Sequence, residues 1–165
     1  MKKIALLVLS SALAFAPVWA QLASPLPQGS GAGVHSPNSP FAPLPQRGDV
    51  VQWSVLTSIA TKAEKNKLVP VFTKDQLALN QKPQRIQGFM MPLEPGEKQT
   101  HFLLSSVPLS CGFCVPGGPE SMVEVKTKTP VQYTLDPVVV EGRFATLTND
   151  EYGLYYRMTE AVAVK

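Results

Sequence analysis

The 165-residue sequence lacks the short motifs that mark the common enzyme classes. It contains no G-x-S-x-G, no H-E-x-x-H, no phosphate-binding G-x-x-x-x-G-K-S/T and no G-x-G-x-x-G. Histidine is scarce, and one of the two residues, His35, lies in a segment that we expect to be unstructured. A histidine-dependent hydrolase would therefore rely on His101 alone. These absences lead us to expect a protein that is not an enzyme of a conventional kind.

Excess charge is also missing. The formal net charge is +3, and without Lys2 and Lys3 the chain would carry 13 basic and 12 acidic residues, a net charge of +1. Nucleic-acid binding requires clustered lysine and arginine, so we expect no nucleic-acid partner. After the first twenty residues, no hydrophobic stretch is long enough to cross a membrane.

The first twenty residues have the organisation of a secretory signal peptide. Lys2 and Lys3 form a positive start, and residues 4–16 form an apolar stretch too short to span a bilayer comfortably. Val18 and Ala20 stand at the two positions that a signal peptidase reads. We therefore expect cleavage after Ala20, export from a bacterium and a periplasmic location, which is an oxidising compartment.

The rest of the chain divides into a leader and one domain. Residues 21–48 are rich in proline, glycine and serine and show no hydrophobic period, so we expect a disordered or partly extended leader. Residues 49–165 have the length of a single globular domain.

The patterns within 49–165 predict a mainly β (α+β) fold. Val51, Val55 and Ile59 recur at helical spacing and predict a helix over 50–63, and a second short helix or turn is expected at 74–79. Gly88 is expected at a bulge. Strands are expected at 85–93, 99–107, 122–126, 138–147 and 153–164. About five antiparallel strands would close into a small OB-like barrel, with a half-open sheet packed by the first helix as the alternative.

The two cysteines, Cys111 and Cys114, lie three positions apart in the run S-C-G-F-C-V-P-G-G-P-E. In redox enzymes of the thioredoxin type, a helix starts at the first cysteine of such a pair and stabilises its thiolate. Proline and glycine after Cys114 prevent a normal helix here. A disulfide staple, half of a metal site and a redox switch therefore remain open, with the staple favoured. The residues expected to shape the loop are Gly112, Pro116, Gly117, Gly118 and Pro119.

A metal site would need ligands beyond the two cysteines. Thiolates suit Zn(II) or Cu(I), but two of them supply only half of a tetrahedral site, and a second C-x-x-C is absent. His101 is the best additional candidate, because its predicted strand leads into the loop, and Glu120 is another. No cofactor follows with certainty from the residues, and zinc and copper are the candidates.

Several motifs together resemble a known family. The motifs are G-F-M-M-P-L-E (88–94), H-F-L-L (101–104), C-x-x-C-x-P-G-G-P-E-S-M-V-E-V (111–125) and V-V-V-E-G-R-F (138–144). In this order they resemble an exported bacterial family catalogued as domain of unknown function 3299. In the family pattern, a histidine stands two positions after the first cysteine, where this chain has Phe113.

The resemblance implies a secreted or lipid-anchored protein of Gram-negative bacteria. Some members are encoded beside export-type ABC transporters, in settings that suggest metal homeostasis, particularly of zinc. A membrane transporter component or another periplasmic protein is thus the expected partner. In this chain Cys114 is an addition, so a Cys-x-His pair would be replaced by Cys-x-x-Cys.

Together these observations predict an exported periplasmic, non-enzymatic binding or accessory protein that uses the Cys-x-x-Cys loop. A thiol-disulfide redox protein is the first alternative. The second is a structural module whose disulfide is a staple and which meets its partner through Tyr152, Tyr155 and Tyr156.

Overall fold

The structure is a computed structural model that describes residues 32–65 and 67–164. The predicted signal peptide and the first part of the leader lie outside these residues. Helices α1 (Trp53–Thr57) and α2 (Lys74–Leu79) precede the barrel strands in the sequence, and a short 3-10 helix, η1 (Pro119–Ser121), lies between the second and third barrel strands along the chain. The strands are β1 (Ala60–Glu64), β2 (Lys67–Val71), β3 (Pro83–Pro92), β4 (Lys98–Ser105), β5 (Met122–Gln132), β6 (Val138–Thr146) and β7 (Tyr156–Val164). None of the helices among the described residues has the length and apolar character needed to cross a membrane.

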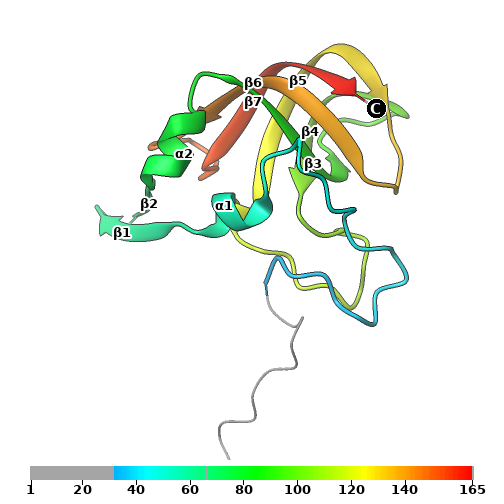
Figure 1. Cartoon of the computed structure of the whole chain (residues 1–165), viewed down its shortest axis with the longest axis horizontal. Helices are drawn as coiled ribbons and strands as arrows, with labels where there is room; N and C mark the ends of the chain where they lie inside the picture. Colours follow the sequence, from blue (N-terminus) through cyan, green and yellow to red (C-terminus); the bar gives the residue numbers. More distant parts are fainter. Residues whose placement is uncertain (1–31, 66, 165) are drawn as a thin grey trace, which may run out of the picture.

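Five strands form a closed barrel in the order β3-β4-β5-β7-β6, while β1 and β2 form a separate two-stranded sheet (Figure 1). The predicted mainly β, OB-like barrel with two short helices is thus confirmed. Neighbouring barrel strands are antiparallel except for β5 and β7, which are parallel. The expectation of antiparallel strands throughout is wrong at this pair. Strand β6 runs antiparallel to both β3 and β7, so β7 has the direction of β3 and therefore of β5, beside which it lies.

Alternating residues of the barrel strands fill its interior. Ile86, Phe102, Val125, Phe144 and Met158 are all fully buried in one hydrophobic cluster. This alternation follows from the two-residue period of a strand, which points every second side chain inward. The same period that predicted the strands therefore decides which of their residues form the core.

The predicted helix over 50–63 is wrong in its second half. Helix α1 ends at Thr57, and strand β1 begins at Ala60 and pairs with β2. Side-chain hydrogen bonds draw the last carbonyls of α1 away from helix continuation: Gln76 Nε2 donates to the carbonyls of Val55 (2.8 Å) and Leu56 (3.1 Å). The apolar spacing was helical, but the chain changes direction where these tertiary contacts form.

The structure differs from expectation at Gly88. The expected bulge at Gly88 is absent, and the register instead shifts between Glu141 and Arg143, around Gly142. Gly88 lies where β3 changes its partner from β6 to β4, and a Cβ there would lie 2.6 Å from the carbonyl oxygen of Ser105. Close approach of two backbones, rather than a bulge, is what requires a glycine at this position.

Candidate functional site

The loop between β4 and η1 carries the cysteine pair. Cys111 and Cys114 are joined in a disulfide, with 5.3 Å between their Cα atoms. The amide of Cys111 donates to the carbonyl of Pro108 and the amide of Cys114 to that of Cys111, each at 3.2 Å. These are tight turns, and no helix begins at either cysteine. The loop therefore lacks the helix that lowers a thiol pKa in thioredoxin-like proteins.

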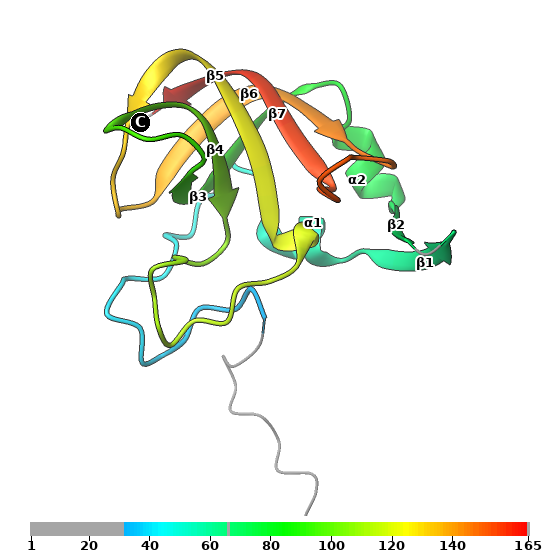
Figure 2. The same cartoon turned by 180° about the vertical axis from the view of Figure 1, so that it is seen from behind.

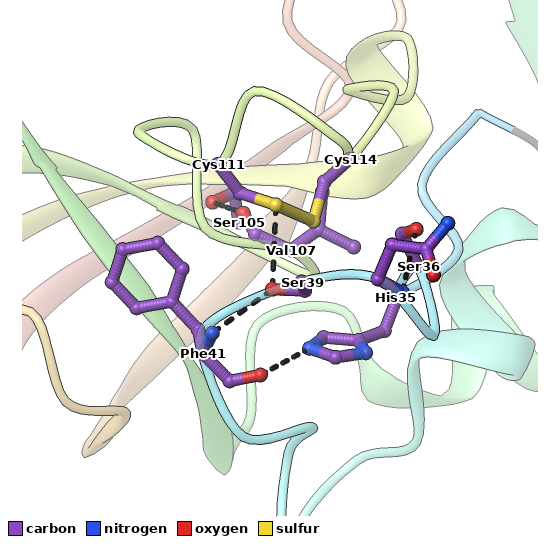
Figure 3. Close-up of a disulfide and its surroundings, with 9 residues drawn as sticks. His35, Ser36, Ser39, Phe41, Ser105, Val107, Cys111 and Cys114 are labelled. Carbon is purple, nitrogen blue, oxygen red and sulfur yellow. Dashed lines mark hydrogen bonds between the residues drawn. A yellow bond between two sulfur atoms is a disulfide. The ribbon is translucent and has the colours of Figure 1, made fainter.

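The disulfide is buried under residues from the leader. Cys111 and Cys114 are 5% and 6% exposed and form a small apolar cluster with Val107, against which Phe41 packs. The Ser39 hydroxyl lies 3.3 Å from Cys111 Sγ and donates to it, since a disulfide sulfur carries no proton (Figure 3). Ser39 lies 72 residues before Cys111 in the sequence, so a distant segment of the chain covers the sulfur atoms.

The described part of the predicted leader has a defined place. The Gly33 amide donates to the Val115 carbonyl (2.8 Å), and the Ser106 hydroxyl donates to the Gly33 carbonyl (3.0 Å). His35 Nε2 donates to the Phe41 carbonyl at 2.9 Å. Residues 32–48 contain no helix or strand, in keeping with their composition, yet they pack along the cysteine loop (Figures 1 and 2). The packed unit therefore begins before residue 49, where the sequence placed the start of the domain.

The loop-shaping residues have different roles in the structure. A Cβ at Gly117 would overlap the side chain of Ser121, whereas Gly112 faces open space. Pro119 stands in the first turn of η1, where its missing amide hydrogen costs nothing. Pro116 is exposed between Val115 and Gly117. A packing reason for glycine thus exists at Gly117, and nothing in the structure requires one at Gly112.

The Glu120 carboxylate is engaged within its own turn. Its carboxylate accepts a hydrogen bond from the Gly118 amide at 2.9 Å and closes the turn before η1. This is a local structural contact of the kind that short acidic side chains make near a helix start.

His101 is also engaged elsewhere. It lies on the face of β4 opposite the buried Phe102, and its Nε2 is 2.8 Å from Glu124 Oε1. Strand β4 continues to Ser105 before the loop begins, so His101 and the disulfide are separated along the strand. Among the described residues, no group of three or more His, Cys, Asp or Glu side chains is placed to hold a metal ion. The two cysteines, His101 and Glu120 therefore do not fit a metal centre as arranged.

Sequence reasoning missed an ion-pair network on the outside of the barrel. Val123 and Val125 point into the core, so Glu124 between them lies on the outer face of β5. It is nevertheless only 3% exposed. It accepts hydrogen bonds from His101 and from Arg157 Nε, and Arg157 Nη2 donates to Asp150 Oδ1 at 2.8 Å. The sequence signal was the glutamate within a valine-rich strand, but nothing local identified its partners.

The network shifts the titration of its two carboxylates. Burial alone would raise the pKa of Glu124, but the hydrogen bonds from Arg157 and His101 outweigh it, so its pKa lies below the ordinary value. Burial likewise opposes ionisation of Asp150, and the amides of Leu154 and Tyr152 together with Arg157 lower its pKa. Both carboxylates are therefore ionised at neutral pH, which pairs them with the cationic Arg157.

The tip of the cysteine loop is apolar and exposed. Phe113 is 64% exposed and Val115 is 57% exposed, while the cysteines on either side of Phe113 are buried. No charged residue occurs from Pro108 to Pro119. The disulfide thus holds a neutral, hydrophobic apex away from the barrel, and large exposed aromatic side chains of this kind are typical of contact surfaces.

Fold and loop together define a small OB-like barrel module with a disulfide-stapled apical loop. The chain belongs to the DUF3299 family, whose description is a protein of unknown function and whose model matches residues 40–162. The match includes Phe41 and the whole cysteine loop, and it confirms the family resemblance inferred from the motifs. A crystal structure of a DUF3299 family protein from Pseudomonas aeruginosa PAO1 is similar, with 28% identity and a TM-score of 0.46 over 58% of this chain and 68% of that chain. No curated protein matches the chain.

Proposed function

We propose that this chain is an exported, non-enzymatic binding or accessory protein that contacts a protein partner through the tip of its cysteine loop. The observation that carries the proposal is the contrast between the buried disulfide and the exposed Phe113 and Val115. A covalent constraint close to an aromatic contact residue reduces the conformational entropy lost on binding. The disulfide is, on this proposal, a staple that presents the contact residues.

The partner that suits this tip has an apolar, uncharged pocket. The segment from Pro108 to Pro119 has no charge, so ion pairing at the tip itself cannot provide affinity. A component of a membrane transporter, as the family resemblance implies, or another periplasmic protein is the proposed partner. On this proposal, any role in metal homeostasis would depend on the partner, because the cysteines, His101 and Glu120 do not form a ligand set.

Cross-linking in exporting bacterial cells tests the proposed contact. With a photoreactive phenylalanine analogue at position 113, we expect a defined cross-linked partner, identified by mass spectrometry. The same analogue at Tyr152, which is also highly exposed but lies on the β6–β7 loop, is the matched control. In a separate pull-down without the cross-linker, Phe113→Ser should reduce recovery of the partner about tenfold or more, as for an aromatic hot spot. Equal cross-linking at both positions, or none at position 113, would contradict the proposal.

The oxidation state of the cysteine pair separates the staple from its two rivals. The buried disulfide, with no helix to stabilise a thiolate, should have a reduction potential below about −300 mV, measured by equilibration with thiol buffers. Reduced protein should retain neither Zn(II) nor Cu(I) at micromolar concentration in native mass spectrometry. A potential of about −180 to −230 mV would favour a redox protein, and stoichiometric metal binding that Cys111→Ser abolishes would favour a metal site.

A further inference from the structure

Residues 33–41 of the leader form a strap that is attached to the cysteine loop at both of its ends. At the first end, the Gly33 amide donates to the Val115 carbonyl at 2.8 Å, and the Gly33 carbonyl accepts from the Ser106 hydroxyl at 3.0 Å. The backbones come close here, since a Cβ on Gly117 would lie 3.2 Å from the Cα of Gly33. The strap thus contacts the chain both before and after the cysteine pair.

The second end of the strap lies directly over the sulfur atoms. Ser39 Oγ lies 3.3 Å from Cys111 Sγ and also accepts from the Phe41 amide at 3.1 Å, which orients the hydroxyl (Figure 3). The Phe41 side chain packs against the cluster that Val107 forms with the two buried cysteines. Thiol–disulfide exchange depends on access of the attacking thiolate to a sulfur atom, and the strap blocks this access.

The strap is held to the rest of the molecule by few contacts. Several of its hydrogen bonds are internal: the Ser39 amide donates to the Ser36 carbonyl at 3.0 Å, and His35 Nε2 donates to the Phe41 carbonyl at 2.9 Å. Residues 32–48 contain no helix or strand, and among the described residues Phe41 is the one partly buried apolar side chain that packs against the cysteine cluster. Segments with few buried apolar contacts open at a lower free energy than the whole domain unfolds.

We propose that residues 33–41 are a cover that controls the access of thiols to the disulfide and that opens locally while the barrel stays folded. Once the cover is open, the thiolate of a reductant bonds to one cysteine sulfur, the S–S bond breaks and the other cysteine leaves as a thiolate. With a dithiol reductant, its second thiol then displaces the first cysteine. Two cysteine thiols and a disulfide of the reductant result.

This cover determines how long the oxidised loop persists among thiols. It acts on the rate of reduction, whereas the reduction potential is an equilibrium property. The proposal does not depend on a partner at the loop tip. A missing cross-link at position 113 would contradict the proposed contact of the tip and would leave the cover unaffected.

The initial rate of reduction of the folded full chain in excess dithiothreitol tests the proposal, with alkylation and mass spectrometry as the readout. Phe41→Ala removes the apolar contact of the cover and should speed reduction about tenfold or more. Leu44→Ala is the matched control, because Leu44 is a partly buried leader residue that does not pack against the cysteine cluster. It should reduce at the rate of the wild type.

A variant weakened in the barrel separates local opening of the cover from unfolding of the domain. Glu124→Ala removes the buried acceptor of Arg157 and does not touch the strap. If reduction required unfolding, this variant should be reduced about a hundredfold faster than the wild type, in proportion to its loss of stability. With local opening, its rate should stay within about twofold of the wild-type rate.

A measurement on the wild type alone gives the same distinction. Local opening exposes little surface, so the reduction rate should change little with urea below the unfolding transition. A steep dependence on urea, or rates that follow the loss of stability in Phe41→Ala and Glu124→Ala alike, would overturn the proposal. A wild-type rate equal to that of the chain unfolded in urea, or an unchanged rate in Phe41→Ala, would overturn it as well.

Discussion

Replacing Glu124 with alanine is expected to lower the free energy of unfolding by about 3 kcal/mol, measured by urea denaturation at neutral pH. The substitution leaves Arg157 Nε and His101 Nε2 without their shared acceptor. Removing one partner of a buried ion pair typically costs about 3–5 kcal/mol, and the lower end applies because Arg157 keeps its contact with Asp150.

Two comparisons make this prediction specific. Glu141 pairs with Arg85 on the surface, where both side chains are well exposed, so Glu141→Ala should cost less than about 1 kcal/mol. In a double-mutant cycle, Glu124→Ala and Arg157→Ala should show a coupling of about 0.5–3 kcal/mol. Additive effects of the two substitutions would show that the ion pair does not contribute to stability.

The same carboxylate predicts a pH dependence with a defined sign. Its pKa is lowered in the folded state, so its stabilisation is complete above the unfolded-state pKa of about 4.3 and is lost as the pH falls through the lower folded-state value. The stability difference between the wild type and Glu124→Gln should therefore be constant near neutrality and shrink in acid. A difference that grows on acidification would contradict the assignment.

The second large effect is expected at Gln76, which is fully buried at the start of α2. Its Nε2 donates to the carbonyls of Val55, Leu56 and Ser58, and its Oε1 accepts from the Thr73 amide at 2.8 Å. One side chain thus caps the start of α2 and the end of α1 together. Each buried backbone group left unpaired costs about 1–3 kcal/mol, so Gln76→Ala should destabilise the protein by about 3 kcal/mol.

Tyr156→Phe is the matched comparison for Gln76. The Tyr156 hydroxyl donates to the Leu56 carbonyl at 2.7 Å, and that carbonyl keeps Gln76 as a partner when the hydroxyl is removed. We therefore expect a loss of only about 1 kcal/mol. If thermal and urea unfolding show equal losses for the two variants, Gln76 does not link the two helices in the way described.

Local patterns were sufficient for most of the barrel. Two-residue alternation located the five barrel strands. The proline and glycine after Cys114 excluded a helix at the cysteine pair. Each of these features depends on a few neighbouring residues, whose backbone preferences hold whatever the rest of the chain does.

The surroundings of the cysteine loop and of Glu124 depend on contacts between residues that are far apart in the sequence. Phe41 and Ser39 cover the disulfide, and Arg157 reaches Glu124 from another strand. His101 was expected near the loop, but the alternation of β4 places it on the face where Glu124 lies. Whether a predicted strand points a side chain toward a site depends on its register with its neighbours, which the sequence of that strand does not contain.

The sequence alone identifies the family, the strand pattern and a stiff loop around Cys111 and Cys114. Coverage of the disulfide by the leader and exposure of Phe113 at the tip appear only in the folded chain. These two kinds of feature depend on interactions of different range along the chain. Backbone preference and hydrophobic period act over a few residues, whereas burial and partnership arise when closure of the barrel brings separate segments together.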